Sequence, residues 1–287
     1  MRVAILGLGQ IGGSAGRALI AAGDPWNVVG WTRTQDGRRA AAADGMDVTA
    51  TMAEACAGSD VVVLAAPPLA CLELIDALAG GVGEDLASGA VITDVASTKA
   101  VIVARAVERG LRFVGGHPMA GRESSGYGSS DPGLFLGRRW VITPSEPPDA
   151  EAEARVAALA VACGAEVIRL GAAAHDAAVA AISHLPLVVA AALVEAVADD
   201  GDWPVAQRLA AGGWASMTRL ARGDVEMATG ILATNAPAVA GRLRDLRRVL
   251  DQWLEELDAT PPEAERLRSR LASARSTLGA DRPGEDG

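Results

Sequence analysis

The sequence predicts an α/β protein in two parts, a doubly wound, largely parallel N-terminal sheet followed by a region built only of helices. In the first 170 residues, short apolar runs rich in β-branched residues alternate with alanine-rich, helix-like segments. Continuous apolar strands separated by helices indicate a parallel sheet covered on both faces. After Leu170 the strand pattern stops, and the chain reads as helix to about Ser276. We therefore place the parts at residues 1–170 and 171–278.

Seven strands are expected, with helices connecting them. The apolar runs that predict them lie at 2–6, 28–31, 60–66, 90–96, 112–116, 139–143 and 165–170. In the helical part the longest periodic segment is 239–259, which predicts an amphipathic helix. Glycine, proline and charged residues dominate 279–287, so we expect a disordered tail there.

Composition and charge exclude several classes of protein. The 287 residues carry 26 Lys+Arg against 36 Asp+Glu, for a net charge of −10. This acidic balance argues against nucleic acid and anionic membranes as partners. Three widely spaced cysteines without a CxxC pair indicate neither a disulfide framework nor a metal site. The chain begins directly with a predicted strand and shows no signal peptide, so we expect a cytoplasmic protein.

The apolar stretch at 172–198 has two possible interpretations. It is long enough to span a bilayer. It also contains polar residues, among them His175 and Glu195, which favour burial in the protein or in a subunit interface. We therefore predict that the helical part is a dimerisation domain that forms a homodimer. His175 is interpreted as a residue of the domain junction.

A glycine-rich turn joins the first predicted strand to the first helix. Gly7, Gly9 and Gly12 form the motif GLGQIG. In such a unit the first glycine permits the tight turn, the second lets a pyrophosphate approach the backbone, and the third allows close packing of helix and strand. The pyrophosphate lies on unpaired N–H groups at the helix N-terminus. The motif predicts a Rossmann-type dinucleotide site that includes Gln10 and Ile11; the alternative is a turn without a ligand.

The end of the second strand bears on the choice between NAD and NADP. An acidic residue about 20 residues past the glycine turn would bind the ribose 2′-hydroxyl of NAD. Thr32 occupies that place, followed by Arg33, with Arg38 and Arg39 close behind. A hydroxyl beside a guanidinium suits a 2′-phosphate, so the sequence favours NADP over NAD. Alternatively, these arginines only solvate the start of the next helix.

Two polar segments follow neighbouring strands. They are DVASTK at 94–99 and FVGGHPMAGRESSG at 113–126. Because ligands of open α/β sheets bind at the carboxyl ends of strands, Ser97 and His117 are expected near the nicotinamide site. Lys99 is the only lysine among the 26 basic residues. It either occupies a place where a compact ammonium matters or is a chance survivor in an arginine-rich chain.

Two more polar segments lie in the helical part. SHLP at 183–186 interrupts the apolar stretch, and GGWASMTRLA follows at 212–221. A proline inside a helix removes one backbone hydrogen bond and kinks the helix. We expect this kink to direct Ser183 and His184 into a cleft.

Together these motifs resemble the prephenate dehydrogenase family, which includes the arogenate and cyclohexadienyl dehydrogenases. The resemblance covers nearly the whole chain and rests on five elements at family-like spacing: GLGxIG, D-x-x-S-x-K at 94–99, GGHPMAG around His117, SHLP at 183–186, and Gly-Gly…Thr-Arg ending at Arg219. It implies NAD(P)-dependent oxidative decarboxylation of prephenate to 4-hydroxyphenylpyruvate, or of arogenate to tyrosine, in tyrosine biosynthesis. It also implies dimers whose helical domains intertwine.

The residue types suit that reaction. A neutral imidazole at His117 can accept a hydrogen bond or the proton from the ring hydroxyl of the substrate. Ser97 can hydrogen-bond His117 or the same hydroxyl. Arg219 suits bidentate pairing with a carboxylate, and the resemblance assigns it to the substrate, with Ser183 and His184 in its polar surroundings. The remaining predicted site residues are Gly212 for the substrate and Ala66 and Pro67 for the cofactor.

Each of these residues also has a purely structural interpretation. His117 could cap a turn, and Ser97 could cap a helix that begins near Thr98. His184 could be a hydrogen-bonded core histidine, and Arg219 could bridge subunits.

The chain departs from the family pattern at three places around the substrate. Some members have a second histidine where Leu187 stands, and many have a tryptophan where Ala228 stands. Arg122 replaces a small hydroxyl residue. A basic Arg122 near the substrate side chain would favour the keto acid prephenate over the amino acid arogenate.

Two other classes of protein share some of these features. Hydroxyacid, ketopantoate and imine-reducing dehydrogenases have a similar first motif and a helical second half, but they use a lysine on the C-terminal helices. Here Lys99 lies in the N-terminal part, which argues against them. A non-catalytic, NADP-binding dimer would have no need for Ser97, His117 and Arg219 together.

Overall fold

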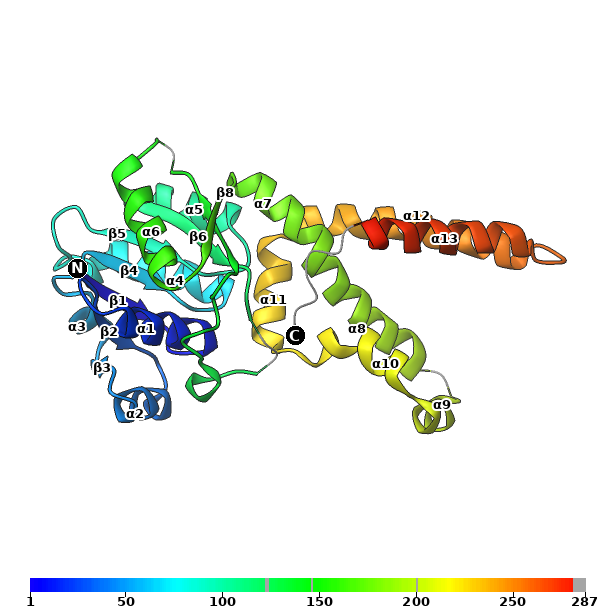
Figure 1. Ribbon diagram of the computed structural model, residues 1–287, viewed down its shortest axis with the longest axis horizontal. Helices are drawn as coiled ribbons and strands as arrows, with labels where there is room; N and C mark the ends of the chain where they lie inside the picture. The colour runs from blue at the N-terminus through cyan, green and yellow to red at the C-terminus, as the bar shows by residue number, and fades with distance from the viewer. Residues whose placement is uncertain (122–123, 146, 200, 281–287) are drawn as a thin grey trace. The chain divides into compact units, whose positions relative to one another are not determined.

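The computed structural model describes residues 1–121, 124–145, 147–199 and 201–280 (Figure 1). It divides the chain into two compact units, Met1–Val239 and Ala240–Gly287. The first unit holds the sheet, the helices around it and most of the helical region. The last helix extends to Ala280, two residues into the predicted tail, and the rest of that tail lies outside the described residues.

The first unit is built on one eight-stranded sheet in the order β3-β2-β1-β4-β5-β6-β7-β8. All strand pairs are parallel except β6 with β7. The strands are β1 (Arg2–Leu6), β2 (Asn27–Trp31), β3 (Asp47–Val48), β4 (Val61–Leu64), β5 (Val91–Asp94), β6 (Phe113–Pro118), β7 (Arg139–Thr143) and β8 (Glu166–Arg169). All seven expected strands are present, and the expected doubly wound sheet is confirmed. Only the two-residue β3 is additional, because so short a strand leaves no apolar run in the sequence.

Alternate residues of the central strands face two separate cores, as the unbroken apolar runs require. Val3 and Ile5 of β1 lie in a core covered by α1 (Gln10–Ala22) and α6 (Ala150–Ala162). Ala4 and Leu6 lie in the opposite core, covered by α3 (Met52–Cys56), α4 (Pro68–Ala77) and α5 (Ala100–Glu108). The strand order reverses between β1 and β4, and the crevice at the carboxyl ends of these two strands is where open α/β sheets bind their ligands.

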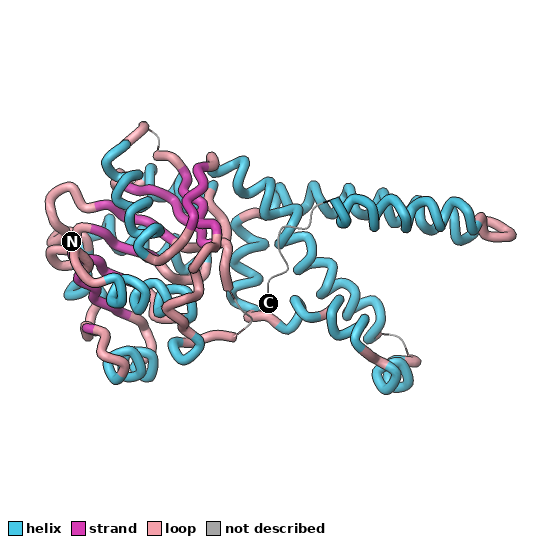
Figure 2. Tube along the Cα trace, in the orientation of Figure 1, coloured by secondary structure: helices cyan, strands magenta, loops and turns pink. Residues whose placement is uncertain are grey.

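Thirteen α-helices lie in the described chain, and in Figure 2 the described part after β8 consists of helices joined by loops. They are α1 (Gln10–Ala22), α2 (Gln35–Ala43), α3 (Met52–Cys56), α4 (Pro68–Ala77), α5 (Ala100–Glu108), α6 (Ala150–Ala162), α7 (Ala172–Val179), α8 (Leu185–Ala198), α9 (Trp203–Leu209), α10 (Gly212–Met217), α11 (Val225–Thr234), α12 (Ala236–Asp258) and α13 (Ala264–Ala280).

A π-helical turn, Ala180–His184, joins α7 to α8 just before Pro186. Proline lacks the N–H that would continue the regular ladder, so the helix is distorted at this place, as the sequence predicts. The whole stretch Ala172–Ala198 is long and apolar enough to cross a membrane, with a mean hydropathy of 2.2 in its most apolar window. Only 22% of that window is buried within the chain. Most of this apolar helix is therefore available to a partner.

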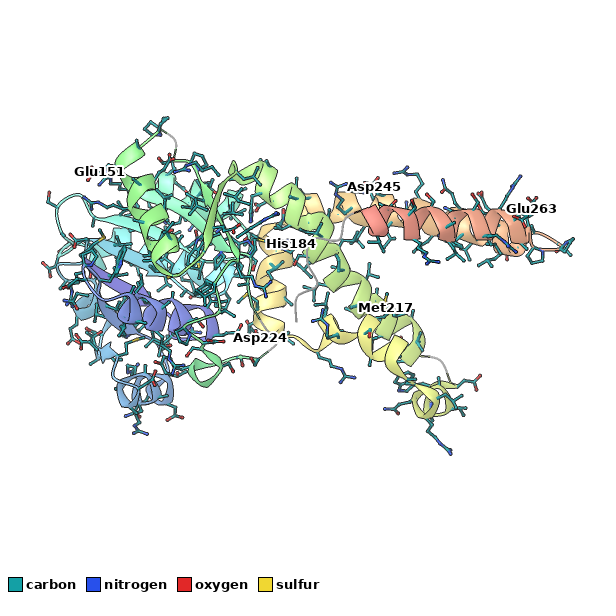
Figure 3. All side chains as sticks on the ribbon, in the orientation of Figure 1. Glu151, His184, Met217, Asp224, Asp245 and Glu263 are labelled. Atoms are coloured by element: carbon teal, nitrogen blue, oxygen red, sulfur yellow. The ribbon has the colours of Figure 1, made fainter. Side chains whose placement is uncertain are left out.

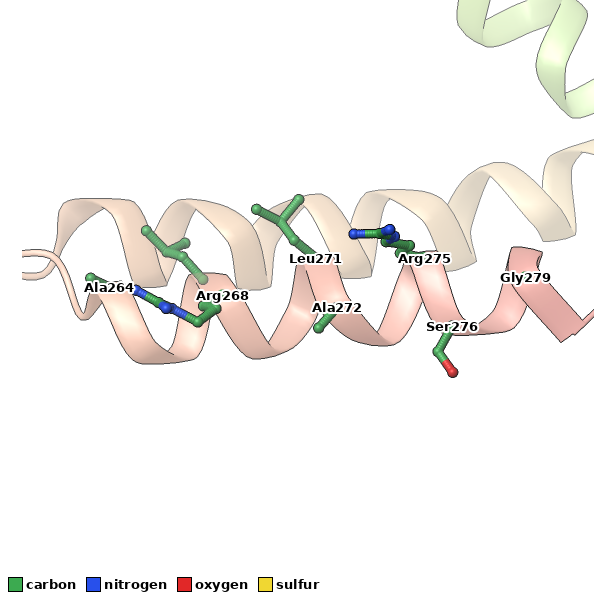
Figure 4. A pocket seen from close by; sticks show the side chains of 8 residues that line it. Ala264, Arg268, Leu271, Ala272, Arg275, Ser276 and Gly279 are labelled. Carbon is green, nitrogen blue, oxygen red and sulfur yellow. The ribbon is translucent and has the colours of Figure 1, made fainter.

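The second unit is a hairpin of two antiparallel helices, the greater part of α12 and the whole of α13 (Figures 1 and 2). The Arg270 guanidinium lies 4.7 Å from the centre of the Trp253 ring and donates to Glu256 at 3.1 Å. An open groove runs along α13 and is lined by Leu267, Leu271 and their neighbours (Figure 4). The helix expected at 239–259 is α12, which begins three residues earlier and ends one residue earlier.

Candidate active site

The glycine turn has the shape that a dinucleotide requires. Gly7 has φ +116°, and a Cβ there would lie 2.1 Å from the Ala65 carbonyl oxygen. A Cβ at Gly12 would lie 1.9 Å from the Gly7 oxygen, so neither glycine can carry a side chain. Gly9 differs, because a Cβ there would meet nothing within 4 Å. The open space over Gly9 lies at the N-terminus of α1, where no side chain caps the helix, so these residues fit a pyrophosphate.

The other residues predicted around this turn surround the same crevice. Gln10 is buried, and its side-chain amide donates to the Ser124 hydroxyl at 3.0 Å. Ile11 is half-buried on the first turn of α1. Ala66 and Pro67 directly follow β4, the neighbour of β1 in the sheet, and are half-buried. Pro67 precedes the first residue of α4.

The loop after β2 leaves one arginine available. Arg38 donates to the backbone oxygens of Thr32 and Arg33, at 2.5 and 3.0 Å, and so holds the loop together. Arg39 pairs with Asp36 at 3.5 Å. The Arg33 side chain is exposed, and the described residues give it no ionic partner. Arg33 is therefore the guanidinium of this loop that is free to meet a ligand.

A buried carboxylate fixes the strand ends that carry Ser97 and His117. Asp94, at the end of β5, accepts hydrogen bonds from the backbone N–H groups of Ala96 at 3.1 Å and Gly116 at 3.0 Å. These amides precede Ser97 and His117 in the chain. The Lys99 ammonium pairs with the same carboxylate, and both side chains are fully buried. The only lysine of the chain is thus a compact buried counter-ion to Asp94.

His117 is half-buried on β6 and contacts a second histidine. Its Nδ1 lies 2.8 Å from Nε2 of His175, whose Nδ1 lies 2.8 Å from Oδ1 of Asp176. Asp176 also accepts from the N–H groups of Lys99 and Ala100 at 2.8 Å each. It therefore caps α5, and the interpretation of Ser97 as the cap is wrong. Ser97 itself is half-buried and makes no hydrogen bond to His117 within the described chain.

Hydrogen bonds from the helices complete this buried cluster. The Asn235 amide donates to the backbone oxygen of Asp176 at 2.9 Å and lies 3.1 Å from Nδ1 of His184. The hydroxyls of Thr98 and Thr234 are 2.7 Å apart. These contacts tie α11 and the start of α7 to the end of β5 and the start of α5.

Two imidazoles of the cluster, those of His117 and His184, are neutral at physiological pH. Burial, reinforced by the neighbouring His175, Lys99 and His184, places the pKa of His117 well below its ordinary value of 6.5. Burial lowers the pKa of His184 to about 4. Although burial acts to raise the pKa of Asp176, hydrogen bonds from His175, Ala100 and Lys99 bring it below its ordinary value, so this carboxylate is ionised.

The residues predicted to bind the substrate differ in burial. His184 is 1% exposed, and its Nε2 has no hydrogen-bond partner among the described residues; Figure 3 labels it on the helical stretch between α7 and α8. Ser183, one residue earlier, is exposed, so the distorted helix does not direct both side chains to one place. Gly212 and Arg219 are exposed, and the turn Arg219–Arg222 packs on α8.

Both halves of the chain match known domain families. Residues 15–169 match the family described as prephenate dehydrogenase, nucleotide-binding domain, and residues 171–272 match that described as prephenate dehydrogenase, dimerization domain. The chain belongs to the prephenate dehydrogenase family. The resemblance predicted from its motifs is confirmed, and the family assignment excludes the hydroxyacid, ketopantoate and imine-reducing alternatives.

Relatives in this family include enzymes and solved structures. The chain is 31% identical over 256 residues to a prephenate dehydrogenase of Lactococcus lactis subsp. cremoris, covering 88% of this chain and 70% of that protein. The prephenate dehydrogenase of A. aeolicus, solved in complex with hydroxyphenyl propionate and NAD⁺, is 27% identical with a TM-score of 0.87, and 98% of each chain is covered. An arogenate dehydrogenase of Synechocystis is 30% identical with a TM-score of 0.79, covering 97% of this chain and all of that one.

Within this prephenate dehydrogenase fold, the sequence interpretation missed one contact of His117. His175 is the residue we assigned only to the domain junction, yet it is the one that bonds His117. The sequence offered one signal for this contact: the chain has only three histidines, so each of them was a candidate for the site. Of the three departures from the family pattern, Leu187 and Ala228 are half-buried, and Arg122 lies outside the described residues.

Proposed function

We propose that this chain catalyses the NAD(P)-dependent oxidative decarboxylation of prephenate to 4-hydroxyphenylpyruvate, the step that leads to tyrosine. The observation that carries the proposal is the His117 imidazole, which burial keeps neutral near the end of β6, in a chain of the prephenate dehydrogenase family. A neutral imidazole can accept the proton of the C4 hydroxyl as that carbon is oxidised. Loss of CO₂ then makes the ring aromatic, which drives the reaction forward.

The other residues position the reactants. Asp94 holds the amides that precede Ser97 and His117, so both side chains stay at adjacent strand ends. Ser97 is proposed to hydrogen-bond the substrate hydroxyl. Arg219 is proposed to pair with a carboxylate of the substrate, with Ser183, His184 and Gly212 around it. Positioning of this kind can supply much of the rate enhancement of a two-reactant step.

The glycine turn, Gln10, Ile11, Ala66 and Pro67 are proposed to hold the dinucleotide, whose nicotinamide accepts the hydride when bound. We infer that NADP is preferred over NAD. Support comes from the exposed Arg33, which has no ionic partner among the described residues, and from Thr32 where NAD enzymes carry an acid.

The second candidate substrate is arogenate, which would be converted to tyrosine directly. It is favoured by the similarity of this chain to the arogenate dehydrogenase of Synechocystis over 97% of its length. The two substrates differ at one end, where prephenate has a keto group and arogenate an ammonium.

The test is a kinetic grid of prephenate and arogenate against NAD and NADP, followed by absorbance of the reduced cofactor. We expect the highest kcat/KM with prephenate and NADP. A higher kcat/KM with arogenate would move the assignment to the second substrate, and no turnover with either would contradict the proposed function.

Arg33→Asp tests the cofactor preference. We expect kcat/KM for NADP to fall by about 10- to 100-fold, because a charge-assisted bond to the 2′-phosphate is replaced by repulsion. The kcat/KM for NAD should stay within about threefold of that of the unmodified protein, since the 2′-hydroxyl of NAD carries no charge. Arg39→Asp is the matched control, because the guanidinium of Arg39 already pairs with Asp36. A strong preference of the unmodified protein for NAD would contradict the NADP assignment.

We further propose that the chain is a homodimer joined through its helices. Exposed apolar side chains support this, among them Ile182 (71%), Leu209 (78%), Val225 (74%) and Leu271 (61%). Light scattering of the 29.2 kDa chain without detergent should give about twice that mass. A stable monomer, or recovery only with membranes, would contradict the dimer and the predicted cytoplasmic location.

A further inference from the structure

A chain of three side chains leads away from the proposed proton acceptor. Oδ1 of Asp176 lies 2.8 Å from Nδ1 of His175, and Nε2 of His175 lies 2.8 Å from Nδ1 of His117. The two rings meet edge to face, with their centres 5.1 Å apart and their planes at 77°. His175 is 1% exposed and the side chain of Asp176 is 7% exposed, so the bond between these two residues is shielded from water.

The carboxylate of Asp176 determines which atom donates and which accepts in the hydrogen bonds that join these three side chains. An ionised carboxylate only accepts, and three other groups keep this one in place: the N–H groups of Lys99 and Ala100, and the Asn235 amide on its backbone oxygen. Nδ1 of His175 must therefore carry a hydrogen and donate it to Asp176.

The tautomer of the second ring follows from that of the first. An uncharged imidazole has one N–H and one bare nitrogen. In the arrangement proposed below His175 is uncharged, so with its hydrogen on Nδ1 its Nε2 is an acceptor. Nδ1 of His117 must then carry the hydrogen that forms the bond between the rings. Nε2 of His117 is left bare, with its lone pair free to take a proton.

We propose that His175 and Asp176 are positioning residues that fix His117 in the tautomer with a bare Nε2. This inference deepens the proposed function and rests on it for its catalytic consequence. When Nε2 takes the proton of the substrate hydroxyl, the electron pair of that O–H bond stays on oxygen. Nδ1 keeps its own proton, and the positive charge on His117 is stabilised through His175 by the ionised Asp176.

The competing interpretation is that Asp176 only caps α5 and His175 only packs. A purely structural pair would influence the stability of the fold but not which nitrogen of His117 is protonated. The tautomer is therefore the property to measure, and it does not depend on turnover of any substrate.

The experiment uses ¹⁵N NMR of the imidazole nitrogens in the full-length protein, which has only three histidines. In the unmodified protein His117 should show a protonated Nδ1 and a bare Nε2. In His175→Leu, which has no acceptor, hydrogen should move to Nε2, the form that imidazole prefers in water. The kcat should fall by about 10- to 100-fold with KM changed by less than about twofold.

Two further variants make the result decisive. His175→Gln keeps an amide oxygen that can accept from His117, and should retain the bare Nε2 and kcat within about fivefold of the unmodified protein. Thr234→Val, the matched control, removes the nearby buried bond to Thr98 and should change neither the tautomer of His117 nor kcat. Hydrogen on Nε2 in the unmodified protein, or an unchanged tautomer and kcat in His175→Leu, would overturn the proposal.

Failure of this inference can be distinguished from failure of the proposed function. If the unmodified protein oxidises neither prephenate nor arogenate, the proposed function fails while the tautomer measurement still stands. If His175→Leu does not fold, the spectra of the unmodified protein and of His175→Gln still decide the assignment.

Discussion

Replacing His117 with asparagine is expected to lower kcat by about 100-fold or more while leaving the protein folded. Asparagine places a polar atom near the position of Nδ1, so it can keep a hydrogen bond to His175. It has nothing at the position of Nε2, where the substrate proton would go. Steady-state kinetics with the preferred substrate and cofactor would measure the loss, and a kcat within about threefold of the unmodified value would refute the role of His117.

The pH dependence of kcat gives a second measure of the same imidazole. His117 must be neutral to accept a proton, so activity is present above its pKa and is lost as the pH falls through it. Because burial and the nearby His175, Lys99 and His184 lower that pKa, kcat should stay level near pH 7 and decline only well below pH 6.5. His117→Asn should lack this acid limb. Unchanged thermal unfolding would show that the variant retains its fold.

Replacing Lys99 with methionine is expected to lower the free energy of unfolding by about 3–5 kcal/mol. Both Lys99 and Asp94 are fully buried, so removal of the ammonium leaves a carboxylate with no counter-charge in the core. Denaturation by urea, with the midpoint and slope compared to those of the unmodified protein, would measure the loss. Lys99→Arg should also be less stable than the unmodified protein. A Cβ on Gly115 would already lie 3.2 Å from Cδ of Lys99, so the core has little room for a larger head group.

Two further variants test the cause of this loss. The double variant Lys99→Met with Asp94→Asn should be more stable than Lys99→Met alone, because the uncompensated charge is gone. Arg109→Met removes a partner of Asp76 at the surface and should cost much less, since both side chains are well exposed. Equal losses from Lys99→Met and Arg109→Met would contradict the proposed burial effect.

The fold was predictable from local patterns. Each strand except the two-residue β3 is a short apolar run, and the close contacts of Gly7 and Gly12 with the backbone explain why GLGQIG appears at the first turn. Both are properties of neighbouring residues, which a sequence displays directly. The π-helical turn before Pro186 is likewise a local feature that the sequence displays.

The contacts of the site were less accessible because they join residues far apart in the chain. His117 and His175 are 58 positions apart, and Lys99 and Asp176 are 77 apart. No periodicity links such pairs. The cap of α5 shows the difficulty: Ser97 is the natural candidate in the sequence, but a carboxylate from α7 takes that place.

The buried bonds from α7 and α11 to β5, β6 and α5 have a consequence for how the enzyme opens. The proposed proton acceptor, His117, lies on β6 and its partner His175 lies on α7, so a hinge motion between these two elements would break the 2.8 Å bond between the histidines. It would also strip Asp176 from the first amides of α5. If these bonds persist during turnover, any movement that admits the substrate would have to occur in other segments, and the proposed proton acceptor would keep its partners.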